Sequence, residues 1–178
     1  SDGIEAIHNR AFAGCANLKS VTIPKSLKYI GTDNPFAYCY YLDSIVVSKE
    51  NSLFDSRDNC NAIIRTKDNT LLCACKSTEI PSSVETIYTD AYRGCLMREI
   101  KLPVGLKTIM EYAIYDCPNL DRIHIPSSVE EIYPRAFSMC DNIESISVDR
   151  NNPVYDSRNN CNAILENDRL IIGCYTSR

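Results

Sequence analysis

Apolar and polar residues alternate in several short stretches of this chain, and some of these stretches end directly at a proline. The clearest copies are Val21-Thr22-Ile23-Pro24 and Ile123-His124-Ile125-Pro126. Alternation with a period of two is typical of a β-strand with one buried face. Because proline cannot donate a hydrogen bond to a neighbouring strand, we predict that these strands end at their prolines.

Two further apolar segments follow each predicted strand. The first is an aliphatic pair spaced by three residues, such as Leu27 and Ile30, and we predict a second short extended segment or turn there. The second has the form Ala-Phe-x-x-Cys, as in residues 136–140. This segment is too short for a long helix, so we expect a single helical or 3₁₀ turn.

Five cysteines mark the repeat of this pattern, and we call them the ladder cysteines: Cys15, Cys39, Cys95, Cys117 and Cys140. Their spacing is 24 residues between the first two, and 22 and 23 residues among the last three. A unit of about 23 residues cannot bury its own apolar face, so neighbouring units must stack. The chain is therefore predicted to form a β-rich, right-handed solenoid of short parallel strands with a period of about 23 residues.

An insertion interrupts the repeat, because 56 residues separate Cys39 from Cys95. The sequence at 54–63 returns at 155–164, a shift of 101 residues, so the insertion is itself repeated. In the second copy, apolar runs flank the turn-forming pair Asn167-Asp168, which indicates a β-hairpin. We predict two inserted β-hairpin modules, near residues 49–78 and 150–175.

The predicted register of these hairpins places Cys60 opposite Cys75, and Cys161 opposite Cys174. Directly opposed cysteines come within disulfide range, and an exported protein can oxidise them. Against this, Cys73 lies two residues from Cys75 and has no counterpart in the second module. The sequence leaves both the disulfide and the thiol forms open.

The other candidate chemistry has simpler structural explanations. The ladder cysteines lack the close Cys-x-x-Cys spacing of a metal site, and Cys73/Cys75 is a still weaker metal candidate. We therefore predict that the ladder cysteines are small buried core residues. His124 is expected to point outward from its strand and His8 to lie in a turn, so neither indicates Cys–His catalysis. The Asp-Ser-Arg segment that begins at Asp55, like its second copy, lacks the glycine and distal glutamate of a calcium loop and is predicted to form a turn.

The composition fits a single solenoid domain over residues 1–178 and excludes several function classes. The chain is 44% hydrophobic and 24% charged, which excludes intrinsic disorder. No apolar run approaches the about 20 residues that a membrane span needs. The net charge is −4 without a basic cluster, so nucleic acid and anionic membranes are poor partners. We predict no catalytic residue, metal or cofactor.

The repeat also resembles a known family. The pattern Cys-x-x-Leu-x-x-Val-x-Ile-Pro-x-x-Leu-x-x-Ile at 15–30, together with the Ala-Phe-x-x-Cys units, is similar to the BspA-like leucine-rich repeats. The Asn-Cys-Asn-Ala-Ile module is similar to segments of that family's members in gut bacteria. The resemblance covers almost the whole chain and implies a leucine-rich-repeat solenoid.

The same resemblance gives an expected function. The resemblance implies a secreted or cell-surface bacterial protein, in a family associated with adhesion to host proteins, other bacteria or extracellular matrix. It brings no catalytic motif, so the chain is not expected to be an enzyme. The expected function is non-catalytic binding of an extracellular protein or glycan.

The outward residues of the repeated strands are the candidate binding face, because stacking aligns them into one continuous surface. Tyrosine and arginine are frequent interface anchors, so Tyr29 and Arg122 are the individual candidates. Further outward strand residues are Ser20, Thr22, Ser44, Val46, Ser145 and Ser147. The predicted partner-binding residues are Tyr29, Glu99, Lys101, Lys107, Arg122 and His124.

Two alternatives remain open. The solenoid could be a structural spacer that holds another domain away from the envelope, or a thiol-dependent enzyme with an exposed cysteine of low pKa. The chain begins in the middle of a repeat and shows no polar capping repeat or anchoring segment. We therefore expect that its solenoid ends permit self-association, and that any signal or anchor lies outside this segment.

Overall fold

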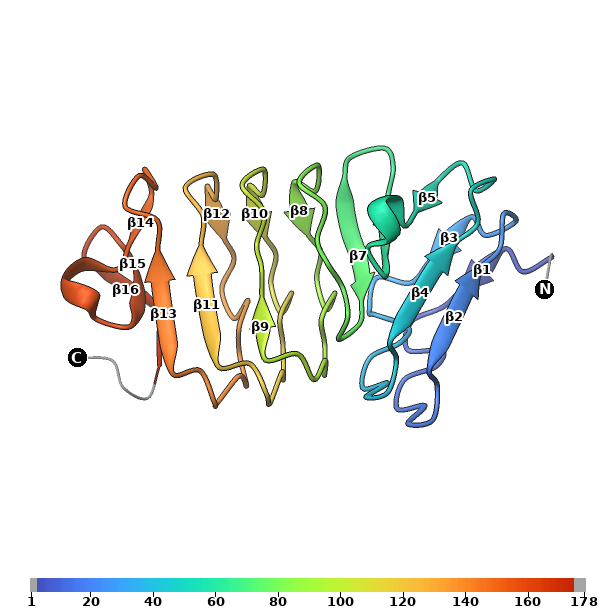
Figure 1. The fold of residues 1–178 in the computed structure, drawn as a ribbon, viewed down its shortest axis with the longest axis horizontal. Coiled ribbons are helices and arrows are strands. Elements are labelled where there is room, and N and C mark those ends of the chain that lie inside the picture. The colour runs from blue at the N-terminus through green and yellow to red at the C-terminus, as the bar shows by residue number, and fades with distance from the viewer. Residues whose placement is uncertain (1–2, 175–178) are drawn as a thin grey trace.

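Short parallel strands from successive turns of the solenoid pair side by side along the long axis of the computed structural model, which describes residues 3–174 (Figure 1). We call each turn a coil. The first strand of each coil, which corresponds to the alternating segments of the sequence, lies in one of two separate sheets. One sheet contains β2 (Ser20–Ile23) and β4 (Ser44–Val47), and the other contains β9 (Glu99–Ile100), β11 (Arg122–Ile125) and β13 (Ser145–Val148).

The second residue of each aliphatic pair lies in a second short strand, which agrees with the predicted extended segment or turn. These two-residue strands are β1 (Ala6–Ile7) paired with β3 (Tyr29–Ile30), and β8 (Thr86–Ile87), β10 (Thr108–Ile109) and β12 (Glu131–Ile132) in one sheet. Thr108 pairs with Thr86 on one side and with Glu131 on the other, which are offsets of 22 and 23 residues. The predicted solenoid and its period are confirmed.

The segment that ends in each ladder cysteine is a pair of tight turns, not the predicted helical or 3₁₀ turn. In the first coil, the amides of Ala11 and Cys15 donate to the carbonyls of His8 and Phe12 at 3.2 and 3.1 Å. The backbone is left-handed one and five residues before most ladder cysteines, which interrupts any helix. These left-handed residues are Arg10, Gly14, Tyr38, Asp90, Gly94, Tyr112, Asp116, Arg135 and Met139.

The ladder cysteines link neighbouring coils as well as filling space. Cys39, Cys117 and Cys140 are buried, as predicted, whereas Cys95 is half-buried and Cys15 in the first coil is exposed. The buried thiols donate to carbonyl oxygens of the preceding coil at 3.0–3.1 Å. A weak hydrogen bond therefore accompanies the parallel backbone pairing from one coil to the next.

Both predicted hairpin modules are present, and each has a third strand and a 3₁₀ turn in addition. The first module contains β5 (Phe54–Asp55), η1 (Arg57–Asn59), β6 (Ala62–Arg65) and β7 (Thr70–Ala74). The second contains β14 (Tyr155–Asp156), η2 (Arg158–Asn160), β15 (Ala163–Glu166) and β16 (Arg169–Gly173). β7 pairs in parallel with β8, so the first module joins the sheet β12-β10-β8-β7-β6-β5.

The first hairpin is buried on both faces and separates two hydrophobic clusters. Ala62, Ile64, Leu71 and Ala74 pack in the cluster of the C-terminal coils, whereas Ile63, Leu72, Cys73 and Cys75 pack in that of the N-terminal coils. Burial on both faces explains why this hairpin consists of continuous apolar runs instead of alternating residues.

The predicted register of the hairpin cysteines is wrong by one residue. Ala62 pairs with Ala74, so Asn61 and not Cys60 lies level with Cys75. The cause is a β-bulge at Leu72, where two consecutive residues face the same cluster.

The second module has the same bulge, and there the amide of Cys174 donates to the carbonyl of Asn162 at 3.3 Å. The turn itself is where we predicted it, between Glu166 and Arg169. Cys60, Cys75 and Cys161 carry thiols, so neither predicted pair is a disulfide in this structure.

An asparagine fixes the start of each module. The Asn51 amide group donates to the carbonyls of Pro24 and Leu27 at 2.9 and 3.0 Å, and its oxygen accepts from the amides of Leu53 and Phe54 at 2.9 Å. Asn152, 101 residues later, makes the equivalent four bonds. Each asparagine therefore ties its module to the coil before it.

Replacing Asn51 by alanine should lower the free energy of unfolding by about 2–4 kcal/mol, because buried backbone groups lose their partners. Asn142 is a matched control, since it is exposed and makes a single amide contact with the Pro118 carbonyl. Urea denaturation of Asn51→Ala and Asn142→Ala measures both effects. Equal losses in the two variants would contradict the assigned role of Asn51.

Candidate functional site

The sheet β9–β11–β13 carries an aligned set of exposed residues, which we call the strand face: Glu99, Lys101, Arg122, His124, Ser145 and Ser147. Backbone register places Arg122 between Glu99 and Ser145, and His124 beside Ser147. Lys101 directly follows β9. The intervening isoleucines of β11 are buried, so the alternation of the sequence becomes a fixed outward row.

The structure brings together four of the six predicted binding residues. Glu99, Lys101, Arg122 and His124 share the strand face, whereas Tyr29 lies in β3 and Lys107 directly precedes β10. The prediction of one continuous face is wrong, because β2–β4 and β9–β11–β13 are separate sheets. The first hairpin module lies between them, and its strand β6 packs beside β4.

Salt bridges at the edge of the strand face hold both signs of charge close together. The Arg122 guanidinium lies 3.2 Å from the Asp121 carboxylate, which also contacts Arg98 at 3.4 Å. A shallow hollow of about 470 Å³ adjoins this pair. It is lined by Arg98, Pro118, Asn119, Asp121, Asn142 and Glu144. Asp121 therefore orients Arg122 beside a polar depression.

His124 lies outward as predicted and interacts within the face. Its Nδ1 is 2.9 Å from the Ser147 hydroxyl on the neighbouring strand. Both side chains are exposed, and the contact joins β11 to β13 on the outside of the sheet. The arrangement suits a hydrogen-bonding surface.

The two predicted residues outside the strand face have local partners. Lys107 Nζ lies 2.7 Å from Glu85, and this hydrogen bond raises the pKa of Lys107 and lowers that of Glu85. Tyr29 is exposed, and its ring centroid lies 5.6 Å from that of His8. His8 thus has an aromatic neighbour that the sequence did not predict.

Arginine and tyrosine side chains form contacts that the strand pattern does not predict. The Arg93 guanidinium lies 4.3 Å from the Tyr115 ring centroid and donates to the Tyr38 hydroxyl at 3.2 Å. Arg135 lies 5.9 Å from the Tyr112 ring centroid and donates to its hydroxyl at 2.7 Å. The signal was the recurrence of these residue types just before the ladder cysteines. These contacts engage the guanidinium groups of the arginines and the hydroxyl groups of the tyrosines. They stabilise the turns that precede the ladder cysteines.

The calcium alternative for the Asp-Ser-Arg segments is not supported. Asp55 accepts from the Arg57 side chain at 2.7 and 2.9 Å and from the Arg57 amide at 3.0 Å, which forms the predicted turn. Across residues 3–174, no group of three or more His, Cys, Asp or Glu side chains is placed to hold a metal ion. The same residues contain no helix with the length and hydrophobicity of a membrane span.

The buried thiols are poor nucleophiles. Burial raises the pKa of Cys60 to about 11 and raises the pKa of Cys73 and Cys95 still further. A thiol with a pKa near 11 is almost fully protonated at neutral pH, and the thiolate is the reactive form.

The repeated sequence matches the model of the BspA-type leucine-rich-repeat region in six copies, over residues 1–66 and 69–167. The chain belongs to this family. No curated protein is similar enough in sequence to match it.

Solved structures of leucine-rich-repeat proteins share the fold at low sequence identity. A leucine-rich-repeat protein from Eubacterium ventriosum is 22% identical with a TM-score of 0.62, over 73% of this chain and 36% of that one. The pneumococcal vaccine antigen PcpA is 21% identical with a TM-score of 0.58, over 83% and 43%. A leucine-rich cell surface protein from Faecalibacterium prausnitzii is 20% identical with a TM-score of 0.52, over 92% and 46%. The chain thus spans less than half the length of each of these proteins.

Thiol labelling of the native protein should distinguish exposed from buried cysteines. We expect Cys15, which is exposed, to react rapidly at pH 8, whereas Cys60, Cys73 and Cys117 react only as fast as the protein unfolds. Peptide mapping after a short pulse of alkylating agent identifies the modified residues. Rapid labelling of Cys73 would contradict the buried position of β7.

The raised pKa of Cys60 also predicts a loss of stability in alkali. The unfolded thiol ionises near pH 9 and the native thiol near pH 11, so the native state holds the extra proton between these values. The Cys60 contribution to the free energy of unfolding is therefore fully present below about pH 9 and falls by about 3 kcal/mol up to pH 11. The free energy of unfolding of Cys60→Ala, measured over this window, should fall less steeply than that of the wild type. Parallel curves would refute this contribution.

Proposed function

We propose that this segment binds an extracellular protein through the strand face, at the surface of a bacterial cell and without catalysis. Membership of the BspA-type repeat family supports this proposal, as does the fold shared with a protein described as a cell surface protein. Solenoids bind partners through extended rows of aligned residues. The observation that carries the proposal is the register-aligned, exposed row of the strand face.

The chemistry of this row favours a protein over a glycan. Sugar-binding surfaces commonly present an aromatic ring for stacking, and the strand face has none. It has carboxylate, guanidinium, ammonium, imidazole and hydroxyl groups on adjacent strands instead. Mixed charges of this kind match the polar groups of a protein surface and determine orientation and association rate.

Arg122 is the central anchor of the proposed interface. Its guanidinium is exposed, and Asp121 holds it at 3.2 Å next to the polar hollow. Arginine held in one direction loses less conformational freedom on binding, and arginine is enriched among interface hot spots. Lys101 and His124 extend the donor groups along the same sheet.

Charge reversal at two positions tests the strand face. The double variant Lys101→Glu/Arg122→Glu should weaken binding to a captured partner at least about tenfold, because close interface charge pairs contribute on the order of 1.5 kcal/mol or more. Surface extracts of host cells, matrix proteins and other bacteria supply the partner, and biolayer interferometry measures the affinity.

The matched control is Lys49→Glu/Lys67→Glu, which makes the same change of charge at exposed lysines outside the strand face. The control should bind as the wild type does. Equal loss in both variants would indicate non-specific electrostatic attraction. A saturable partner that binds the reversed variant unchanged would reject the strand face, and no partner from any extract would favour a structural spacer.

A further inference from the structure

We propose that the turn at residues 38–43, which we call the tyrosine turn, is a second binding site, where exposed tyrosine rings stack on a neutral glycan. Tyr40 and Tyr41 are 40% and 61% exposed. They directly follow the ladder cysteine Cys39 and precede strand β4, so the tyrosine turn lies outside the strand face and both hairpin modules.

Coils pack on both sides of the tyrosine turn, so the exposure of its rings does not come from an absent neighbour. On one side, the Gly14 amide donates to the Ala37 carbonyl at 2.8 Å. On the other side, the Tyr38 amide donates to the Arg93 carbonyl at 3.2 Å. The two exposed rings therefore extend into solvent from a coil that has neighbours in both directions.

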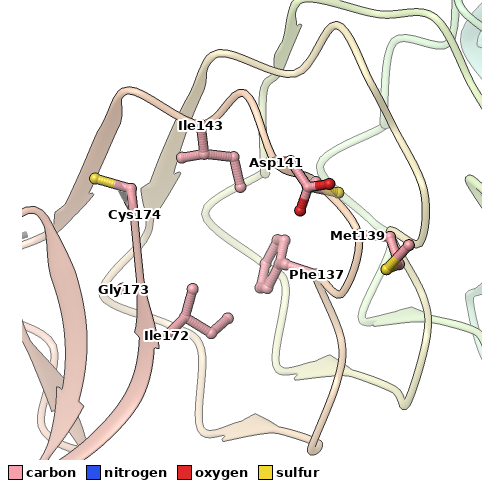
Figure 2. Close-up of a pocket in the computed structure, with 8 residues that line it drawn as sticks. Phe137, Met139, Asp141, Ile143, Ile172, Gly173 and Cys174 are labelled. Carbon is pink, nitrogen blue, oxygen red and sulfur yellow. The ribbon is translucent and has the colours of Figure 1, made fainter. Parts of the chain in front are cut away.

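Other coils have small or polar residues at the positions of these rings. In the three other coils of full length, the two residues after the ladder cysteine are Ala16-Asn17, Pro118-Asn119 and Asp141-Asn142. Figure 2 shows the last of these turns, where Met139 and Asp141 correspond to Tyr38 and Tyr40 by the shift of 101. The pair of adjacent tyrosines is therefore particular to one coil.

Tyr41 replaces an asparagine that has a structural role in the repeat. The side-chain amides of Asn119 and Asn142 donate to the Leu96 and Pro118 carbonyls of the preceding coil, at 3.4 and 2.6 Å. A tyrosine has no amide group for this bond, and its ring exposes apolar surface to water instead. The fold does not explain this exchange, whereas a ligand that covers the ring does.

Contacts within and beside the tyrosine turn fix the orientation of its rings. The Tyr38 and Tyr40 rings meet edge to face, with centroids 6.3 Å apart and an interplanar angle of 74°. Arg93 in the next coil donates to the Tyr38 hydroxyl at 3.2 Å. Gly94 lies so close to the Tyr38 ring that an added Cβ would approach it to 2.4 Å. Rings that are already oriented lose little conformational freedom when they bind.

Polar side chains next to the rings suit the hydroxyl groups of a sugar. Leu42 is buried, so Tyr41 and Asp43 on either side of it both point outward. The Asp43 side chain is 58% exposed, lies 3.8 Å from the Lys76 ammonium group and contacts the Ser77 hydroxyl. Carboxylates accept hydrogen bonds and ammonium groups donate them, whereas a hydroxyl group does both.

This composition favours a neutral glycan over a protein or an acidic polymer. The aliphatic side chain of the tyrosine turn, Leu42, is buried, so the exposed apolar surface is aromatic. A sugar ring has an apolar C–H face and hydroxyl groups at its edge, which match aromatic rings beside hydrogen-bonding side chains. The charges of Asp43 and Lys76 cancel, so the turn does not attract a polyanion. The strand face presents charged and hydroxyl groups, and the two surfaces thus suit different classes of partner.

Replacement of Tyr41 by asparagine tests the site, because it restores the residue type that the repeat has at this position. Affinity electrophoresis measures how strongly a neutral polysaccharide in the gel retards the protein, with mannan, xylan, galactan and β-glucan tested in turn. At least one of them should retard the wild type. Tyr41→Asn should bind that polysaccharide at least about tenfold more weakly, because the stacking ring is lost. Its melting temperature should equal or exceed that of the wild type, which separates loss of binding from loss of folding.

Two further variants are controls. Tyr41→Phe keeps the ring and should bind as the wild type does. Val104→Asn makes a matched change from an apolar residue to asparagine at a side chain that is 77% exposed and lies outside the tyrosine turn, so it should also bind normally.

Failure of all four polysaccharides to retard the wild type would overturn the proposal, as would equal affinity of Tyr41→Asn. Retardation by polygalacturonate alone would show attraction to charge instead of ring stacking, and would overturn it too. If Tyr41→Asn lost a captured protein partner while no polysaccharide retarded the wild type, the tyrosine turn would be a protein-binding site and not a glycan-binding one.

Discussion

Burial of the first hairpin on both of its faces is the constraint on which the rest of the structure depends. Strands β6 and β7 send alternate side chains into two hydrophobic clusters, so neither cluster is complete without them. β7 then presents its outer edge to β8, and the regular coils resume from that edge. The backbone of the hairpin sets the register of β8, and through it that of β10 and β12. Its apolar side chains form the surface on which the next coil packs.

The same hairpin determines where a binding surface can form. It divides the strands before the prolines into two sheets, and this restricts the aligned charged row to β9, β11 and β13. Arg122 shares this row with Glu99 because β9 and β11 pair directly, whereas Tyr29 is separated from both by the module. A solenoid with an internal module therefore has shorter but chemically distinct faces.

Most of the fold follows from sequence periodicity, and the differences have physical causes. Val21 and Ile23, or Ile123 and Ile125, identify strands because one face of each is buried. The bulge at Leu72 was not predictable, because in a run that is apolar on both faces the sequence does not indicate which residue faces which cluster.

The Arg93–Tyr115 contact depends on left-handed turn residues, which periodicity does not reveal. Asn51 and Asn152 were detectable, since the shift of 101 relates them as it relates the rest of the modules. Of the candidate site, the sequence predicts the outward residues of each strand but not which coils are neighbours.

The direction of the bonds between coils has a mechanical consequence. Strands lie across the long axis of the molecule, so the hydrogen bonds that join them run along it (Figure 1). Tension applied along that axis breaks these hydrogen bonds one coil at a time, in an unzipping geometry. It does not load the hydrogen bonds of many coils in parallel, as a shear geometry would. Each released coil of about 23 residues adds about 75 Å of extended chain. A solenoid built this way lengthens in small steps under load and absorbs work at each step.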